Sequence, residues 1–133
     1  MNDCIFCKIV DGDIPSIKLY EDEKAIVILD RFPSSIGHAL VVSKEHFRDI
    51  EEVDLDTYAH MMKLAAKFAK KIKKATKCDG INILQNNGES AGQTIFHTHI
   101  HIIPRYKEDE INISWSTLDP SIEELIELKE KIN

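Results

Sequence analysis

Three of the chain's six histidines, His97, His99 and His101, alternate within a single stretch of five residues. The residues between them are β-branched, and we expect a β-strand over residues 95–105. Every second side chain of a strand points to the same face. The three imidazoles are therefore expected on one face, with Ile100 and Ile102 in the core on the other. A row of rings that titrate near pH 7 indicates chemistry at neutral pH.

A metal site is the first chemistry to consider for this row. Alternate residues of a strand are about 6.8 Å apart, so the Cα atoms of His97 and His101 would be about 13–14 Å apart. Zinc binds a ring nitrogen at about 2.0–2.1 Å, and one ion would strain to hold both ends of such a row. Two neighbouring histidines could share an ion, but the spacing disfavours a catalytic site of three histidines on zinc.

Nucleophilic catalysis is the second chemistry. A neutral imidazole can attack phosphorus and form a phosphohistidine-type intermediate, while neighbouring imidazoles donate hydrogen bonds to the phosphate oxygens. The polar loop before the strand offers side-chain donors at Asn86, Gln93 and Thr94, and Gly92 lets backbone N–H groups approach an anion closely. The alternative is a strand whose histidines face solvent without a catalytic role.

A second motif lies near the N-terminus, where two residues separate Cys4 from Cys7. This spacing suits two thiolates on one metal ion. The sequence begins without the basic and apolar regions of a signal peptide, so we expect a cytoplasmic protein whose three cysteines, including Cys78, are reduced. A redox dithiol and two cysteines without a role are the alternatives to a metal site.

The bulk composition limits the classes to which the chain can belong. Its 133 residues suit one domain, and 43% hydrophobic and 30% charged residues are ordinary for a globular protein. The formal net charge of −6 argues against a nonspecific nucleic-acid binder, which needs a basic face. No stretch approaches the roughly 20 apolar residues that span a membrane. We therefore expect neither nucleic acid nor a membrane as a partner.

The elements that must position these residues follow from the apolar periodicity. Apolar residues at three- and four-residue spacing predict a long helix over about 55–77. We also expect a short helix over 45–50 capped by Ser43, and a final helix opened by Asp119-Pro120. Further strands are expected at 17–21, 25–30, 38–42 and 81–85. This order predicts an α+β fold with an antiparallel sheet and helices on one side.

The long helix carries two further groups of side chains. Lysines crowd its C-terminal half, and we interpret this run as a solvated helix face rather than an anion site. Met61, Met62 and Phe68 are expected in the core rather than around a cofactor.

The segment from His97 to Ile103 matches the pattern His-φ-His-φ-His-φ-φ, where φ is apolar, apart from the semi-polar Thr98. Six further segments precede it along the chain and belong to the same set of motifs. In chain order they are Cys-Ile-Phe-Cys-Lys-Ile, Ile-Pro-Ser, Tyr-Glu-Asp, Asp30 to His38, Val-Val-Ser-Lys-Glu-His and Asn-Asn-Gly…Ala-Gly-Gln-Thr. On these motifs the chain resembles the histidine triad (HIT) superfamily, most strongly its Hint-like branch of small bacterial and archaeal proteins. The likeness covers about residues 4–105. It implies a single HIT domain over 1–133, with a helix-bearing C-terminal extension over about 106–133.

The resemblance implies roles for individual residues. The central His99 is similar to the nucleophile that attacks the α-phosphorus of a nucleotide. His101 and His38 would steady the phosphate. Thr94 stands where members commonly have serine, and its hydroxyl would keep a hydrogen-bonding or proton-donating role in catalysis. The implied nucleotide contacts are Asn86, Gly92, Gln93 and Thr94 at the phosphate, Asp30 at the ribose, and Phe6, Ile9 and Ile28 around the purine.

The resemblance also implies the reaction. His99 would displace the leaving group of a purine nucleoside phosphoramidate, and water would then hydrolyse the nucleotidyl-histidine, with no catalytic metal. The close alternative is a dinucleoside polyphosphate (Ap4A-type) hydrolase. Two further hypotheses are a zinc-dependent hydrolase and a nucleotide-binding scaffold with incidental catalysis.

Many HIT relatives with the N-terminal cysteine pair complete a metal site with two histidines. The implied ligands here are Cys4, Cys7, His46 and His97, a closed set that would hold a structural zinc ion. The family fold is a five-stranded antiparallel sheet with one long helix and a C-terminal helix, and it usually forms homodimers. In a homodimer, Met61, Met62 and Phe68 would lie in the interface rather than in the core.

Overall fold

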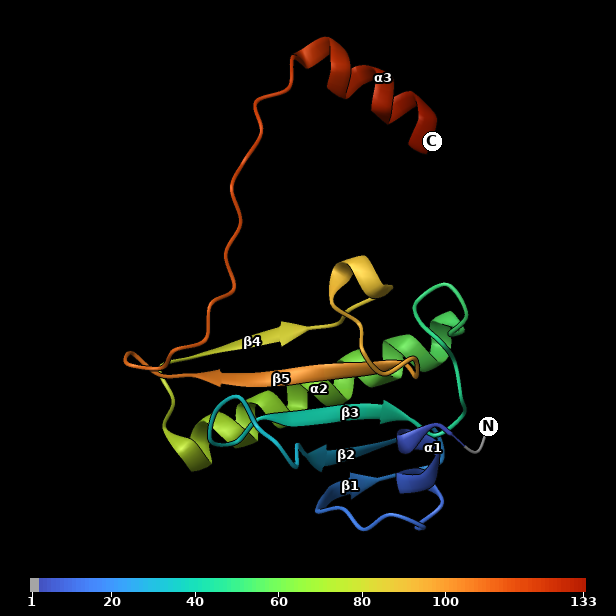
Figure 1. Ribbon diagram of the computed structural model, residues 1–133, viewed down its shortest axis with the longest axis vertical. Coiled ribbons are helices and arrows are strands. Elements are labelled where there is room, and N and C mark those ends of the chain that lie inside the picture. Colours follow the sequence, from blue (N-terminus) through green and yellow to red (C-terminus); the bar gives the residue numbers. More distant parts are fainter. Residues whose placement is uncertain (1–2) are drawn as a thin grey trace.

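The structure is a computed structural model that describes residues 3–133 (Figure 1). Met1 and Asn2 lie outside the described residues. They are the first residues of the expected domain and of the N-terminal segment in which no signal peptide is expected. The strands are β1 (Lys18–Glu21), β2 (Ala25–Leu29), β3 (Ala39–Ser43), β4 (Gly80–Leu84) and β5 (His99–Arg105). The helices are α1 (Ile5–Val10), α2 (Leu55–Thr76) and α3 (Ile122–Ile132), with a short 3-10 turn, η1 (Glu89–Ala91).

The five strands form one antiparallel sheet in the order β1-β2-β3-β5-β4. The apolar segment of the third strand is central, and all five of its residues are buried. The β1–β2 hairpin closes where the Asp22 carboxylate accepts hydrogen bonds from the N–H groups of Lys24 and Ala25. The α+β class and the five-stranded antiparallel sheet expected from the sequence are confirmed.

Alternation along the strands divides the core into two layers. The face covered by α2 holds Ala25, Val27, Ala39, Val41, Ile100 and Ile102, packed against Met61, Leu64 and Phe68. The opposite face holds Ile26, Ile28, Leu40 and Val42, packed against Phe6 and Ile9 of α1. Met61 and Phe68 are therefore core residues in the single chain, whereas Met62 is 39% exposed. Because α1 covers the opposite face, the prediction that all helices lie on one side is wrong.

The register of β5 places His99 and His101 on the α1 side of the sheet. His99 lies opposite Val42 and His101 opposite Leu40, and paired residues of neighbouring strands share a face. Ile100 and Ile102 point to the α2 side, as expected, and both are fully buried.

The histidine strand begins later than predicted, at His99 rather than near residue 95. The backbone N–H of Thr98 donates to the carbonyl oxygen of Phe47 at 2.7 Å, and the Thr98 hydroxyl donates to the same oxygen. Thr98 thus bonds to the segment after β3 rather than to a neighbouring strand through its N–H, and β5 begins at the next residue. His97 therefore precedes the strand, and the three imidazoles do not form one continuous row on it.

Two predicted helix starts are also wrong. Ser43 is the last residue of β3, and its hydroxyl donates to the carbonyl oxygens of Glu45 and Thr98, so no helix forms over 45–50. The final helix begins at Ile122, and its N-cap is Ser121 rather than Asp119-Pro120. Since a serine hydroxyl can bond a free N–H of the first helical turn, Ser121 is the better cap.

The C-terminal part of the chain departs from the sheet. Residues after Arg105 lead into an extended segment that ends in α3, apart from the rest of the molecule (Figure 1). No residue of α3 is buried. Over residues 3–133, no helix has the length and apolar character that crossing a bilayer requires.

Candidate active site and metal centre

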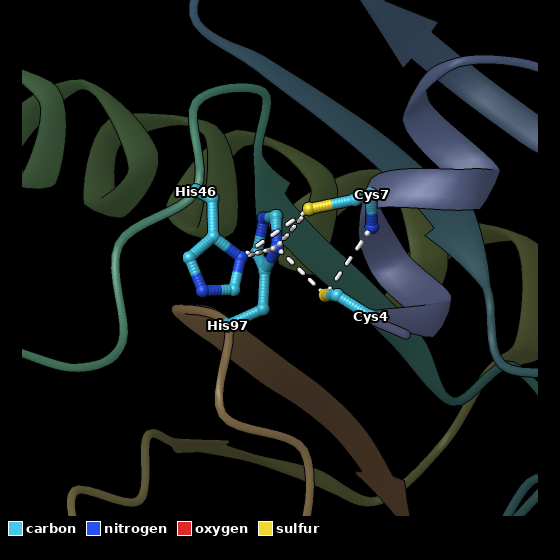
Figure 2. Close-up of side chains that lie close together, drawn as sticks. All are labelled: Cys4, Cys7, His46 and His97. Atoms are coloured by element: carbon cyan, nitrogen blue, oxygen red, sulfur yellow. Dashed lines mark hydrogen bonds between the residues drawn. The ribbon is translucent and has the colours of Figure 1, made fainter. Parts of the chain in front are cut away.

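The four predicted metal ligands converge beside α1 (Figure 2). The Sγ atom of Cys4 lies 3.3 Å from Nδ1 of His97, and Sγ of Cys7 lies 3.3 Å from Nδ1 of His46. The two Nδ1 atoms are 3.1 Å apart. All four ligand atoms lie within 4.8 Å of one another, although they come from three separate segments of the chain.

These separations fit zinc. A tetrahedral ion with Zn–S near 2.3 Å and Zn–N near 2.0–2.1 Å places sulfur and nitrogen about 3.5 Å apart, and two nitrogens about 3.3 Å apart. The donor set also suits the metal, because two thiolates and two imidazoles form a closed structural site. Three of the four ligands are buried or half-buried, and only His46 is exposed.

A hydrogen bond behind the cluster prepares His97 to bind a metal. Its Nε2 lies 2.6 Å from the backbone carbonyl oxygen of Ser43, which can only accept, so Nε2 carries the proton. Nδ1 is left with a free lone pair that faces the two cysteines. Metal-binding histidines commonly have such a partner on the other ring nitrogen.

The Cys7 thiol has the wrong acidity for a redox nucleophile. Burial and the neighbouring Cys4 raise the pKa of the Cys7 thiol to about 11. Reactive dithiols require a lowered thiol pKa, whereas a bound metal ion would deprotonate the thiol directly. The geometry thus favours the metal site over the redox alternative.

The same logic defines the proton of His99. Its Nδ1 lies 2.6 Å from the backbone carbonyl oxygen of His97, so Nδ1 carries the proton and donates it. The Nε2 atom therefore holds the lone pair. Burial lowers the pKa of His99, against the raising effects of the His97 carbonyl and the Asp30 charge. The ring is thus neutral at pH 7, which a nitrogen nucleophile requires.

A chain of hydrogen bonds fixes His38 and His101, the other two histidines of the predicted catalytic site. The backbone N–H of Ser34 donates to Nδ1 of His38 at 3.0 Å, so the proton of neutral His38 is on Nε2. This Nε2 lies 3.0 Å from Nδ1 of His101, which must then accept. The Nε2 of His101 consequently carries a proton that it can donate. Its ring centroid lies 5.0 Å from that of His99.

Asp30, His38 and His101 form a second group with the composition of a metal site. A metal ligand must offer a lone pair, yet the atom of His38 that faces the other two is the protonated Nε2. This Nε2 lies 3.5 Å from Oδ2 of Asp30 and 3.0 Å from Nδ1 of His101. Burial also lowers the pKa of His38, and it lowers the pKa of His101 to about 4. This trio suits neutral hydrogen bonding better than metal binding.

The loop before β5 is braced by Gln93, which is only 2% exposed. Its Oε1 accepts the N–H of Gly88 at 2.7 Å, and its Nε2 donates to the carbonyl oxygens of Arg48 and Ile95. Both amide hydrogens of Gln93 and one lone pair of its Oε1 are thus used within the protein. The side chain of Gln93 therefore supports the loop rather than facing a ligand.

The other predicted loop residues remain accessible. Thr94 is exposed, and Asn86 is half-buried with its amide donating to the carbonyl oxygen of Gly92. Gly92 has φ of +94°, a conformation that a side chain would strain. The loop therefore presents the Thr94 hydroxyl close to Gly92, where no side chain covers the backbone.

The predicted apolar wall lies under the histidines. Phe6, Ile9 and Ile28 are 4%, 9% and 3% exposed and belong to one cluster. The Phe6 ring packs edge-on against His99 at 4.8 Å and against His97 at 5.8 Å. Phe6 thus packs against both the candidate metal ligand His97 and the central histidine His99.

Several of these contacts had no signal in the sequence. The carbonyl oxygens of Ser43 and His97 and the N–H of Ser34 are backbone groups, which no side-chain pattern reveals. Helix α1 was also missed, although Cys4 caps it by accepting from the N–H of Cys7. The cysteine spacing was the available signal, since it can begin a helical turn.

Comparison with known proteins decides the family. The HIT domain matches residues 11–108. The chain belongs to the HIT family. Adenylylsulfatase HINT3 of Arabidopsis thaliana is 49% identical over 108 residues, which are 81% of this chain and 55% of HINT3, so this chain spans about half the length of that relative. Adenosine 5'-monophosphoramidase hnt1 of Schizosaccharomyces pombe is 42% identical over 131 residues, which cover 98% of this chain and 96% of hnt1.

Solved structures of HIT proteins share the fold. A HIT family protein from Bacillus anthracis superposes with a TM-score of 0.94 at 40% identity, covering 98% of this chain and 95% of that one. A Zn-bound histidine triad family protein from Mycobacterium smegmatis gives a TM-score of 0.79 at 36% identity, covering 98% of each chain. The HIT-like fold expected from the motifs is therefore confirmed.

Proposed function

We propose that this HIT protein is a nucleotide hydrolase that cleaves purine nucleoside phosphoramidates through a nucleotidyl intermediate on His99. The observation that best supports this proposal is the 2.6 Å hydrogen bond from Nδ1 of His99 to the His97 carbonyl oxygen. It leaves the Nε2 lone pair available on a buried, neutral ring. The fission yeast relative, which is named an adenosine 5'-monophosphoramidase and covers 98% of this chain, supports the same chemistry.

The first step forms a bond between Nε2 of His99 and the α-phosphorus. The bond from phosphorus to the leaving nitrogen breaks, and that nitrogen keeps the electron pair and takes a proton that the exposed Thr94 hydroxyl relays from solvent. In the second step a water oxygen bonds to phosphorus and releases a proton to solvent, while the bond to Nε2 breaks and its electron pair returns to Nε2. The products are a nucleoside monophosphate and neutral His99.

The neighbouring groups stabilise the phosphoryl oxygens, on which charge accumulates. We assign this role to the Nε2 proton of His101, held by the Ser34–His38 hydrogen bonds, and to the loop at Asn86 and Gly92. Asp30 is the proposed ribose contact. Phe6, Ile9 and Ile28 are the proposed wall of the purine site.

We also propose that Cys4, Cys7, His46 and His97 hold a structural zinc ion. Bound zinc would fix α1 to the segment before β5 and orient the carbonyl of His97 toward His99. It has no direct part in either chemical step. The Zn-bound mycobacterial relative supports this assignment. A cytoplasmic homodimer that acts on a small nucleotide rather than on nucleic acid completes the proposal.

A second candidate substrate is adenylyl sulfate, since the plant relative is named an adenylylsulfatase. Both substrates join a nucleoside phosphate to a leaving group at the α-phosphorus, so the same attack serves both. A dinucleoside polyphosphate is the third candidate, and a binding scaffold without useful turnover is the alternative to an enzyme.

The test compares kcat/KM for adenosine 5'-phosphoramidate, adenylyl sulfate and diadenosine tetraphosphate on the same zinc-loaded preparation. We expect the phosphoramidate to exceed the dinucleotide by at least about tenfold, which is a difference of about 1.4 kcal/mol in transition-state binding. Equal or faster turnover of the dinucleotide would overturn the substrate assignment. Tight binding of the monophosphate with no turnover of any of the three would favour the scaffold.

A further inference from the structure

Gln85 and Asn87 flank Asn86 just after β4, and their side-chain amides bind each other in both directions. Nε2 of Gln85 donates to Oδ1 of Asn87 at 2.7 Å, and Nδ2 of Asn87 donates to Oε1 of Gln85 at 2.9 Å. Both residues are half-buried. Neither is among the residues that the sequence predicted for the site, where only the intervening Asn86 was expected to contact a ligand.

A backbone group fixes the orientation of both amides. The N–H of Ile50, which can only donate, lies 2.7 Å from Oδ1 of Asn87. Since Oδ1 accepts, Nδ2 of Asn87 points to Gln85, whose Oε1 must accept and whose Nε2 must donate. The Tyr58 hydroxyl donates to the same Oε1 at 3.0 Å. The amide pair thus ties together the first turns of α2, the segment after β3 (residues 44–54) and the start of the loop before β5.

The segment after β3 also binds the other end of this loop, through Gln93. Nε2 of Gln93 donates to the carbonyl oxygen of Arg48 at 2.8 Å. Within the loop, the Gly88 N–H donates to Oε1 of Gln93, and the Gln93 N–H donates to the Gly88 carbonyl oxygen. Figure 1 shows the loop with η1 and the segment after β3 at the same end of the sheet. Asn87 and Gln93 therefore hold the two ends of a closed loop on one common support.

Thr94 directly follows this closed loop, and it is exposed. In the proposed reaction its hydroxyl gives a proton to the leaving nitrogen and takes one from a solvent water. Such a donor must lie within hydrogen-bond reach of the leaving atom, and a displacement of about 1 Å can cost a hundredfold in rate. The place of the Thr94 hydroxyl depends on the peptide before it, which belongs to Gln93.

We infer that Asn87 is a positioning residue for the proton relay at Thr94. Its amide pair with Gln85 fixes the Gly88 end of the loop, and the loop in turn places the Thr94 hydroxyl beside the leaving group. Asn87 acts through the loop, because its amide bonds to Ile50 and Gln85 rather than to the reacting atoms. The inference rests on the proposed function, since the relay belongs to that reaction.

Two substrates that differ in the leaving group separate this role from a general loss of structure. Adenosine 5'-phosphoramidate must protonate its leaving nitrogen, whereas the p-nitrophenyl ester of adenosine monophosphate releases a stable anion that needs no proton. We expect Asn87→Ala to lower kcat/KM at least about tenfold more for the phosphoramidate than for the ester. The Kd of adenosine monophosphate, which does not use the relay, should change by less than about threefold.

Two further substitutions test the path from the amide pair to the relay. Asn87→Asp keeps an acceptor for the Ile50 N–H but places a second oxygen against Oε1 of Gln85, and we expect the same selective loss. Gln85→Ala should cause it as well. The chain with Gln85→Ala and Asn87→Ala together should lose no more than about threefold beyond either single variant, because residues that act as one unit are not additive. Ser90→Ala, an exposed change in the same loop, is the matched control and should leave the ratio of the two rates unchanged.

Hydrogen exchange reports the position of the loop without an activity assay. We expect the N–H groups of Gly88 and Gln93 to exchange at least about tenfold faster in Asn87→Ala than in wild type, while those of β5 keep their protection.

The possible failures can be told apart. Equal losses on both substrates, a rate ratio identical to that of wild type, or protection lost throughout the sheet in both Asn87 variants would overturn the inference and leave the proposed function intact. A wild type that turns over neither substrate would overturn both.

Discussion

The Nδ1 atom of His99 lies 2.6 Å from the carbonyl oxygen of His97, so the central histidine donates its proton to the backbone of a metal-ligand candidate. The same peptide unit is also held from its other side, because the Thr98 N–H donates to the Phe47 carbonyl oxygen, as does the Thr98 hydroxyl. A metal ion on His97 would therefore orient the group that sets the tautomer of His99. The candidate metal site and the proposed nucleophile have separate chemical roles, but the backbone from His97 to His99 connects them.

Zinc binding is expected to stabilise the fold. We predict one zinc per chain, and a free energy of unfolding that rises by about 4 kcal/mol when free zinc is 1,000 times its Kd. Chelation should lower the melting temperature, and Cys7→Ser should abolish both the bound zinc and this response. Metal analysis with calorimetry makes the measurement, and Cys78→Ser, outside the cluster, should keep its zinc. A wild-type protein whose melting temperature ignores both zinc and chelator would contradict the assignment.

Gln93 is expected to act as a structural brace. Gln93→Glu keeps the acceptor for Gly88 but replaces the donor to two carbonyl oxygens with a buried negative charge. We predict a loss of about 2–5 kcal/mol in the free energy of unfolding, measured in urea. Glu89→Gln, an exposed change in the same loop, should alter stability by less than about 0.5 kcal/mol. If Gln93→Glu were as stable as wild type but bound nucleotide less tightly, Gln93 would be a ligand contact after all.

His101 should make stability depend on pH. Burial, with the neighbouring His99 and His38, lowers its pKa from 6.5 to about 4. The unfolded chain thus binds a proton between pH 6.5 and 4 that the folded chain does not, so stability falls as pH falls through this window. We predict that wild type loses roughly 2 kcal/mol more than His101→Gln between pH 7 and pH 4.5. Urea unfolding at both pH values makes the comparison, and an NMR titration of the His101 ring gives its pKa directly. A titration midpoint of His101 near pH 6.5, or equal losses of stability in wild type and His101→Gln, would rule out this role of His101.

The sequence predicted the elements whose signals are local. The long helix follows from apolar residues repeated over six turns, and its predicted range of 55–77 differs from the observed Leu55–Thr76 by one residue. The central β3 follows from a run of apolar residues. The four metal-ligand candidates came from a cysteine spacing and a family motif, and the structure brings all four together.

The failures concern features set by long-range contacts. Helix α1 has six residues, too few for a helical period to be visible. The late start of β5 depends on Phe47, which lies 51 residues from Thr98 in the sequence. The internal role of Gln93 depends on carbonyl oxygens of Arg48 and Ile95, which a reading of polar side chains cannot locate.

The most direct test of the central claim is to trap the covalent intermediate. A slowly hydrolysed adenosine 5'-phosphoramidate analogue, labelled in the adenosine, is mixed with enzyme, quenched at neutral or alkaline pH and digested for mass spectrometry. The account predicts an adenylyl group on residue 99 and no adduct in His99→Ala, which should still bind the monophosphate while its turnover falls by at least about a thousandfold. An adduct on another residue, or turnover by the wild type with no adduct during burst-phase sampling, would contradict it.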